Sequence, residues 1–514
     1  MLTKICSSAV HGIEAFPVTV ETLAERGTIF TIVGLPDTAI KESQTRIVSA
    51  MKSCGLNFPH TRLTINLSPA DVKKEGAAFD LPMAIGILTA GEQIHVEGLD
   101  TYMIAGELSL DGSVQPVRGI LPMAIKARQM GLKRMIVPAA NATEAAVVND
   151  VEVFGVETLR EATDLLIGAG GPQPTVVDTR REFHKNAENH DMDFSDVKGQ
   201  EMVKRAFEVA CAGGHNILLV GSPGSGKSMM AKRLPTILPP LSLQEALETT
   251  KIHSVAGRLK RGSMLMTSRP FRAPHHTISP VALVGGGSNP QPGEISLANN
   301  GILFLDEFPE FSRQVLEVLR QPLEDRKITI SRAKYTVDYP ASFMLVASMN
   351  PCPCGYYGHP TRPCTCAPGA VARYMNRISG PLLDRIDIQV EIQPVPFEHI
   401  ASQAPAESSA SIRARVVAAR AIQQKRFAGE PGIYCNAQMN TRLLRQHAWP
   451  DAQGLERLRK AMERNDMSAR AFDRILRVAR TIADLDNSEQ VLPAHIAEAI
   501  GYRNLDRSSY GTAF

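Results

Sequence analysis

The chain has 514 residues, of which 44% are hydrophobic and 21% charged, a composition typical of a soluble globular protein with about three domains. No apolar run reaches the roughly 18 residues of a membrane-spanning helix, and the start lacks the apolar segment of a signal peptide. We therefore expect a cytoplasmic protein without a membrane partner. The net charge of +3 neither requires nor excludes nucleic acid, so any DNA site must be a local patch.

Residues 1–168 are predicted to form a separate α/β domain, with strand-like segments at 61–67 and 114–117 and a helical segment at 121–128. The motifs at 74–80 and 106–121 resemble those of the Lon protease proteolytic domain. By that resemblance Ala78 occupies the position of the nucleophile and Leu121 that of the lysine base. Because neither side chain performs this chemistry, we expect an inactive protease fold that serves assembly or binding.

Residues 169–195 are predicted to be a linker. Gly and Pro are frequent in residues 168–175, and residues 180–191 are polar without periodicity. Both features are typical of a flexible or loosely packed connection.

A glycine-rich loop follows, between a strand-like run at 216–220 and a helical segment at 229–234. This context is the one that a P-loop requires. Glycines let backbone N–H groups approach phosphates, the lysine reaches the β- and γ-phosphates, the serine hydroxyl ligates Mg²⁺, and the helix dipole favours an anion. The sequence therefore predicts a site for ATP and Mg²⁺ at Gly221, Ser222, Pro223, Gly224, Ser225, Gly226, Lys227 and Ser228.

An unusual insertion, residues 269–294, separates the P-loop from the next strand. It contains Arg269, Arg272 and the pair His275–His276, followed by glycines at 285–287 and 293. Adjacent histidines of a strand point to opposite sides, so packing or phosphate contact is favoured over metal binding for this pair.

Two acids and an amide follow buried strand-like runs. Asp306 and Glu307 come directly after the apolar residues 302–305, and Asn350 follows the run 343–348. Side chains at the carboxyl ends of parallel strands face the ligand crevice of an α/β sheet. We expect Asp306 to hold Mg²⁺, Glu307 to orient or deprotonate the attacking water, and Asn350 to sense the γ-phosphate.

Residues 327–337 consist of two β-rich runs around a short basic tip and are predicted to form a hairpin. The tip carries Arg332, Lys334 and Tyr335. Two cations and an aromatic ring suit a phosphate backbone and a stacked base. The alternative is a solvated hairpin end with no ligand.

Four of the eight cysteines form two C-x-C pairs in a Gly- and Pro-rich loop, residues 351–367. Four thiolates close a tetrahedral Zn²⁺ site, although C-x-C is less typical of zinc than C-x-x-C. Reduced thiols and a regulatory disulfide stay open as alternatives. The candidate ligands are Cys352, Cys354, Cys364 and Cys366.

The C-terminal part is predicted to be helical. Residues 411–426 and 469–483 have apolar residues at spacings of three and four, with arginines between them. The arginine-rich faces are interpreted as solvated surface, with DNA binding as the alternative.

Together these motifs resemble the AAA+ ATPases, and within them the ComM/YifB family of the magnesium-chelatase-like branch, over nearly the whole chain. The resemblance implies an adenine-pocket segment at 196–200 with Gly199, an arginine finger at Arg385 and a second sensor at Arg470. Without the resemblance, an ion pair of Arg385 with Asp384 or Asp387 is an equal alternative. The resemblance also implies that the insertion and the hairpin project toward a central pore.

The predicted fold is an inactive Lon-protease-like α/β domain (1–168), a linker (169–195), an AAA+ P-loop core with a helix-2 insertion and a pre-sensor hairpin (196–400), and a helical lid (401–514). The family implies a hexameric ring that moves on DNA, with branch migration in recombination and natural transformation. A magnesium-chelatase motor subunit and a protein-remodelling ATPase stay open as alternatives. No motif supplies side chains for reading base edges, so we expect DNA binding to be independent of sequence.

Overall fold

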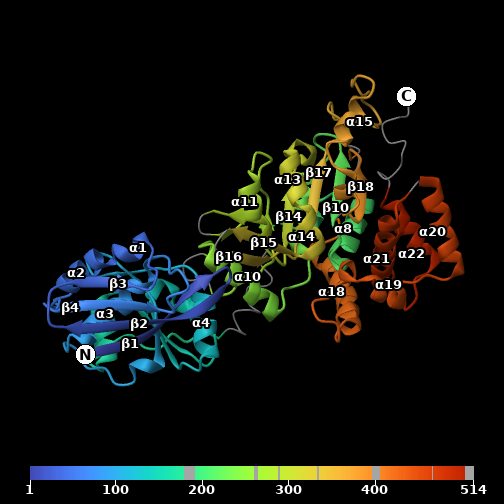
Figure 1. Ribbon diagram of the computed structural model, residues 1–514. Coiled ribbons are helices and arrows are strands. Elements are labelled where there is room, and N and C mark those ends of the chain that lie inside the picture. The colour runs from blue at the N-terminus through green and yellow to red at the C-terminus, as the bar shows by residue number, and fades with distance from the viewer. Residues whose placement is uncertain are drawn as a thin grey trace. The chain divides into compact units, whose positions relative to one another are not determined.

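The computed structural model describes residues 1–178, 192–259, 264–287, 290–332, 335–395, 406–465 and 467–503. The chain forms two compact units (Figure 1). The first consists of Met1–Asn186 and Ser242–Thr267, and the second of Ala187–Leu241 and Ser268–Phe514. Among the residues that the structure describes, no helix has the length and apolar character needed to cross a membrane.

The first unit is built on a seven-stranded mixed sheet in the order β3-β4-β2-β1-β5-β8-β9. Strands β1 and β2 form a long antiparallel pair, and β5, β8 and β9 extend the sheet in parallel. The strands are β1 (Leu2–His11), β2 (Glu14–Glu25), β3 (Phe30–Val33), β4 (Arg62–Ser68), β5 (Tyr102–Ile104), β8 (Arg134–Pro138) and β9 (Glu152–Val156). The main helices are α2 (Ser43–Ser53), α3 (Asp80–Ala90), α4 (Ile120–Gln129) and α6 (Leu159–Leu166).

The predicted strand 61–67 is confirmed as β4, and the predicted helix 121–128 lies within α4. The predicted strand 114–117 is reduced to β7 (Val114–Gln115), which pairs with β6 (Glu107–Leu108). The strand stops there because Pro116 has no N–H to donate to a ladder.

A helix from between the P-loop and the acid pair belongs to the first unit. This helix, α10 (Leu243–Val255), begins at a capping box formed by Ser242 and Glu245. Its Leu247 packs with Met264 and Leu265 against the buried cluster that includes Leu121 of α4. Lys251 pairs with Glu14 at 2.8 Å, and Ser254 hydrogen-bonds the buried Glu144. Residues 242–259 and 264–267 therefore complete the core of the first unit.

The second unit has a five-stranded parallel sheet in the order β11-β14-β17-β10-β18. The predicted strands before the P-loop, the acid pair and Asn350 are confirmed as β10, β14 and β17, and all three are buried along their length. The strands are β10 (Ile217–Gly221), β11 (Phe271–Arg272), β14 (Ile302–Leu305), β17 (Met344–Met349) and β18 (Ile388–Ile392). The helices include α8 (Glu201–Gly213), α9 (Lys227–Ala231), α13 (Arg313–Val318), α14 (Arg320–Asp325), α15 (Ala370–Met375) and α16 (Gly380–Leu383).

The predicted hairpin is confirmed: β15 (Lys327–Arg332) pairs antiparallel with β16 (Tyr335–Pro340). It packs on the insertion, which contains α11 (Pro280–Val284), β12 (Gly285–Gly286), β13 (Gln291–Pro292) and α12 (Glu294–Leu297). The buried Tyr339 hydroxyl donates to the Pro290 carbonyl at 2.7 Å. This hydrogen bond therefore joins the hairpin to the insertion.

The C-terminal region contains the helices α18 (Ser409–Arg426), α19 (Thr441–His447), α20 (Ala452–Asn465), α21 (Ala469–Leu485) and α22 (Pro493–Gly501), which confirms the two predicted helical segments. The expectation that their arginines are solvated is wrong for the inner faces. Arg420 donates to the carbonyls of Cys211 and Ala212, and Arg477 donates to that of Met439. These guanidiniums satisfy backbone groups where helices meet.

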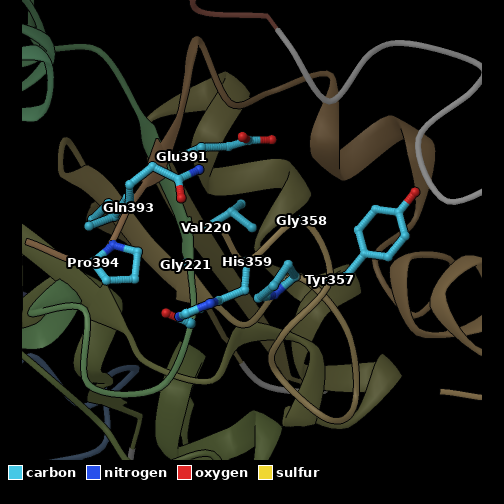
Figure 2. Close-up of a pocket in the computed structure, with 11 residues that line it drawn as sticks. Val220, Gly221, Tyr357, Gly358, His359, Glu391, Gln393 and Pro394 are labelled. Atoms are coloured by element: carbon cyan, nitrogen blue, oxygen red, sulfur yellow. The ribbon is translucent and has the colours of Figure 1, made fainter. Parts of the chain in front are cut away.

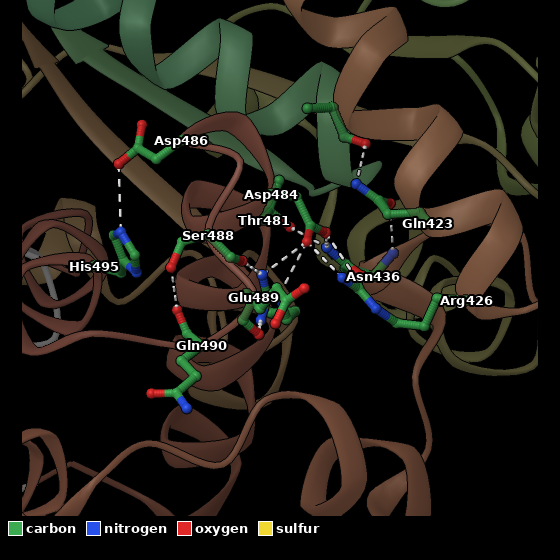
Figure 3. Close-up of polar contacts among 12 residues, drawn as sticks. Gln423, Arg426, Asn436, Thr481, Asp484, Asp486, Ser488, Glu489, Gln490 and His495 are labelled. Atoms are coloured by element: carbon green, nitrogen blue, oxygen red, sulfur yellow. Dashed lines mark hydrogen bonds and ion pairs between the residues drawn. The ribbon is translucent and has the colours of Figure 1, made fainter.

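A buried carboxylate, Asp484 of α21, holds this helical region together (Figure 3). It accepts hydrogen bonds from Arg426 at 2.5 and 2.8 Å, from Asn436 at 2.8 Å and from Arg480 at 3.0 Å. Arg426 belongs to α18 and Arg480 to α21, so one carboxylate neutralises two guanidiniums from two helices.

Replacing Asp484 by Ala is expected to destabilise the second unit by about 3–5 kcal/mol, because two guanidiniums that are 12% and 2% exposed lose their counter-charge. The measurement is the urea-unfolding midpoint of that unit, followed by circular dichroism. Glu456→Ala is the matched control, since its partners Arg459 and Lys460 are solvent-exposed and surface pairs contribute about 1 kcal/mol or less. Equal shifts for the two variants would contradict the role assigned to Asp484.

Candidate nucleotide site

The glycine-rich loop lies between β10 and α9, the context that its pattern requires. Gly224 and Gly226 have φ values of +80° and +90°, a conformation that favours glycine. The Lys227 ammonium donates to the carbonyls of Gly221 at 2.6 Å and Ser222 at 2.9 Å. Burial lowers the pKa of Lys227, while the nearby charge of Asp306 opposes this shift.

The two predicted magnesium ligands lie together. The Ser228 hydroxyl donates to Asp306 Oδ2 at 2.6 Å. The other oxygen of Asp306 is hydrogen-bonded to the Ser348 hydroxyl, a partner that the sequence did not indicate. Parallel pairing of Leu305 with Ala347 places Asp306 level with Ser348. Hydroxyl and carboxylate oxygens are the ligands that Mg²⁺ takes beside phosphate, so these residues fit that ion.

The predicted sensor and water-activating residues flank this pair. Asn350 Oδ1 accepts a hydrogen bond from Lys227 at 3.2 Å. Glu307 has a left-handed backbone, with φ of +54°, and its side chain is 59% exposed. Its Oε2 lies 3.2 Å from Nδ1 of His276, a contact that joins the insertion to the acid pair.

The expectation that His275 and His276 point to opposite sides is wrong. Strand β11 ends at Arg272, so both histidines lie beyond it, and their ring centroids are 4.0 Å apart. Arg272 forms a two-bond ion pair with Glu294 at 2.6 and 2.7 Å. The Arg272–Glu294 pair thus joins two parts of the insertion, and the His276 contact joins the insertion to Glu307.

A pocket beside the P-loop is formed by three segments: the end of β10, the end of β18 and the cysteine loop. Figure 2 shows His359 between Gly221 and Tyr357, whose ring points away from the other labelled residues. Gln200, next to Gly199, donates to the Gln393 carbonyl at 2.6 Å, which puts the predicted adenine segment at the same edge. The lining residues are Val220, Gly221, Ser222, Pro351, Tyr357, Gly358, His359, Glu391, Ile392, Gln393 and Pro394.

Arg385 is buried and forms an ion pair with Glu324 at the end of α14. Neither Asp384 nor Asp387 is its partner, contrary to the simple ion-pair alternative, because Asp387 pairs with Arg474 at 2.5 Å. The pKa of Glu324 is lowered by the Arg385 hydrogen bond and charge, and by the nearby charge of Arg470. The structure therefore pairs Arg385 with Glu324, a residue that sequence analysis missed, while the sensor role of Arg470 stays a prediction.

Only part of the hairpin tip lies within the described residues. Strand β15 ends at Arg332 and β16 begins at Tyr335, and these two residues form the last pair of the ladder. Lys334 lies outside the described residues. Their contact with DNA stays a prediction.

The four clustered cysteines converge, and their Sγ atoms all lie within 4.8 Å of one another.

The structure also shows the surroundings of Ala78 and Leu121, the two positions at which an inactive protease site is predicted. Ala78 lies in a 3-10 turn (Ala77–Phe79), where its carbonyl accepts from Gly106 N–H at 2.8 Å. Leu121 is buried in the first turn of α4, and its N–H donates to Glu144 at 3.0 Å.

Three family models match the chain: magnesium chelatase subunit ChlI at residues 193–400, subunit ChlI of Mg-chelatase at 19–141, and the ChlI C-terminal region at 406–503. Competence protein ComM of Haemophilus influenzae is 42% identical over 510 residues, and YifB of Escherichia coli is 42% identical over 513; each match covers 98% of both chains. Lon protease 2 of Bacillus subtilis is 28% identical over 130 residues, 25% of this chain and 23% of its own. The chain therefore belongs to the ComM/YifB family of magnesium-chelatase-like AAA+ ATPases.

Proposed function

We propose that this protein is a ring-forming ATPase that couples ATP hydrolysis to movement on DNA, as a branch-migration helicase in homologous recombination and natural transformation. The ATPase part of the proposal is supported by the contacts among Lys227, Ser228, Asp306 and Asn350 at the strand ends of one parallel sheet. The Haemophilus relative is a competence protein, which supports a role in natural transformation.

In this mechanism the P-loop holds the phosphates and Lys227 contacts the β- and γ-phosphates. Ser228 and Asp306 hold Mg²⁺, which supplies positive charge at the phosphates. Glu307 orients or deprotonates the attacking water, and His276 fixes the position of that carboxylate. Asn350 reports the γ-phosphate to the P-loop through Lys227.

The surroundings of Arg385 support ring formation. Arg385 pairs with Glu324, whereas Lys227 contacts Asn350 and Asp306 contacts Ser228 in the P-loop site. We propose that both arginines act on the nucleotide of the neighbouring subunit, so that ATP links subunits into a hexamer.

Movement on DNA is assigned to the hairpin and the insertion. The two elements are joined by the Tyr339–Pro290 hydrogen bond, and the two hairpin strands are further linked by Lys327 and Thr329, both bonded to Asp338. The insertion also reaches Glu307 through His276, which provides a physical connection between hydrolysis and the DNA-gripping elements.

The deciding experiment measures ATP turnover with no DNA and with single-stranded, duplex and branched DNA. Stimulation by DNA of any sequence, greatest with branched DNA, is expected. A chelatase motor would instead respond to a porphyrin-binding partner and Mg²⁺, and a protein remodeller to unfolded polypeptide. The proposal would be overturned if no DNA changed ATP turnover while the porphyrin-binding partner or unfolded polypeptide stimulated it.

Replacing Arg332 and Lys334 by Ala should weaken DNA binding equally for all sequences. Each lost phosphate contact removes about 0.7–0.9 from the slope of log affinity against log salt. Tyr335→Ala should cost a further ~1–3 kcal/mol on single strands if a base stacks there. Basal ATP turnover should be unchanged. Lys327→Ala, at the hairpin base, is the control. A triple variant that still unwinds branched DNA normally would leave the insertion as the contact.

A further inference from the structure

The cysteine loop, residues 351–367, places four thiols at the separations of a metal site. Cys352 Sγ lies 3.3 Å from Cys354 Sγ and 3.7 Å from Cys364 Sγ, and the latter two are 3.5 Å apart. A Zn–S bond of about 2.3 Å in a tetrahedron gives S···S separations of roughly 3.8 Å. A disulfide would need about 2.05 Å. Each of the three sulfurs approaches both others, so the arrangement is that of a single centre and not of two disulfide pairs.

The loop backbone supports this geometry. The loop turns at Gly355, whose φ is +85° and whose N–H donates to the Cys352 carbonyl at 3.0 Å.

The same loop forms one wall of the nucleotide pocket. Its turn packs on the P-loop so closely that a Cβ at Gly355 would lie 2.6 Å from Pro223. Cys352 is fully buried two residues after Asn350, which contacts Lys227. Further along, His359 lines the pocket, and its Nδ1 accepts from the backbone N–H groups of Thr361 at 3.2 Å and Arg362 at 3.0 Å (Figure 2).

The cysteine loop, residues 351–367, contains few apolar residues and has no helix or strand. A loop of this length without a hydrophobic core needs another source of order. A metal held by both ends of the loop provides it.

We propose that Cys352, Cys354, Cys364 and Cys366 bind one Zn²⁺, and that the ion holds the loop as a wall of the nucleotide pocket, so that metal occupancy sets nucleotide affinity. The link between metal occupancy and nucleotide affinity rests on one part of the proposed function, namely that the P-loop binds a nucleotide. A preformed wall removes the cost of ordering the loop when nucleotide binds. The expected effect of losing the ion is therefore a roughly tenfold or greater weakening of nucleotide binding.

The first test is the metal content of the full-length protein, purified under reducing conditions without chelator, by elemental mass spectrometry. One zinc per chain is expected, falling to near zero in Cys364→Ser. Cys54→Ser, a cysteine outside the cluster, is the matched control and should keep the metal. A wild-type protein without bound metal, or with iron in place of zinc, would overturn the assignment.

The second test is the Kd of a fluorescent ATP analogue. Cys364→Ser should bind it at least about tenfold more weakly, as should wild type stripped by a chelator, and added Zn²⁺ should restore only the stripped wild type. His359→Ala should keep zinc yet bind nucleotide more weakly. Rescue of wild type separates metal loss from misfolding. Unchanged affinity in the zinc-free protein would overturn the link to the pocket. None of these measurements involves DNA, so they can fail or succeed independently of the proposed function.

Discussion

Replacing Glu307 by Gln is expected to leave nucleotide binding intact while lowering kcat for ATP hydrolysis by about 10²- to 10⁴-fold, the usual contribution of a positioned general base. The amide keeps the size of the side chain but no longer accepts a proton. The predicted magnesium ligands Ser228 and Asp306 are unchanged in this variant, and Asp306 keeps its hydrogen bonds to Ser228 and Ser348. Lys227→Ala should instead abolish binding, because the phosphates lose their main cation.

Single-turnover hydrolysis and equilibrium binding of a fluorescent ATP analogue separate these two phenotypes. His276→Ala should give an intermediate result, with slower hydrolysis and normal affinity, because Glu307 keeps its carboxylate but loses the partner 3.2 Å away. Wild-type turnover in Glu307→Gln would show that another residue activates the water.

Arg385→Ala should keep nucleotide binding and lose about 10³- to 10⁵-fold in kcat, the range for an arginine that stabilises the transferring phosphoryl group. Within one chain this guanidinium is bound to Glu324. On the proposal that Arg385 acts in trans, it exchanges that carboxylate for the phosphate of a neighbouring subunit. The loss should therefore depend on which subunit carries the substitution.

Mixing Arg385→Ala with Lys227→Ala protein tests this dependence, since an intact P-loop and an intact arginine then meet at some interfaces. Partial recovery of hydrolysis is expected. The control is Arg377→Ala, whose surface pair with Glu310 should be dispensable. Absence of recovery in rings verified to be mixed would place Arg385 at its own subunit's nucleotide.

The elements of the site that sequence analysis identified are those whose signal is local. The P-loop, the acid pair and Asn350 each follow a continuous apolar run, and all three runs form strands as predicted. The Ser348 contact depends on the register between β14 and β17, which no single segment encodes. The Arg385–Glu324 pair joins residues 61 positions apart, and nearer carboxylates at 384 and 387 were equally plausible from spacing alone.

The arginines of the last helices illustrate the same limit. A charged residue on an amphipathic helix usually faces water, and the sequence offers no sign that Arg480 is buried against Asp484. Likewise, α10 has the pattern of any capped helix, and only tertiary contacts assign it to the first unit.

The assignment of segment 242–267 to the first unit also constrains the order of folding during synthesis. The core of the N-terminal unit stays incomplete until Met264 and Leu265 are made, later than β10 and the P-loop but earlier than β14, β17 and β18. When that unit closes, residues 192–241 are connected to it at both ends, which reduces their conformational entropy before their sheet partners exist. Strand β10, which precedes the P-loop, is therefore synthesised before β17 and β18, the two strands with which it pairs. Its apolar residues make this interval the stage at which aggregation is most probable and at which a chaperone is most useful.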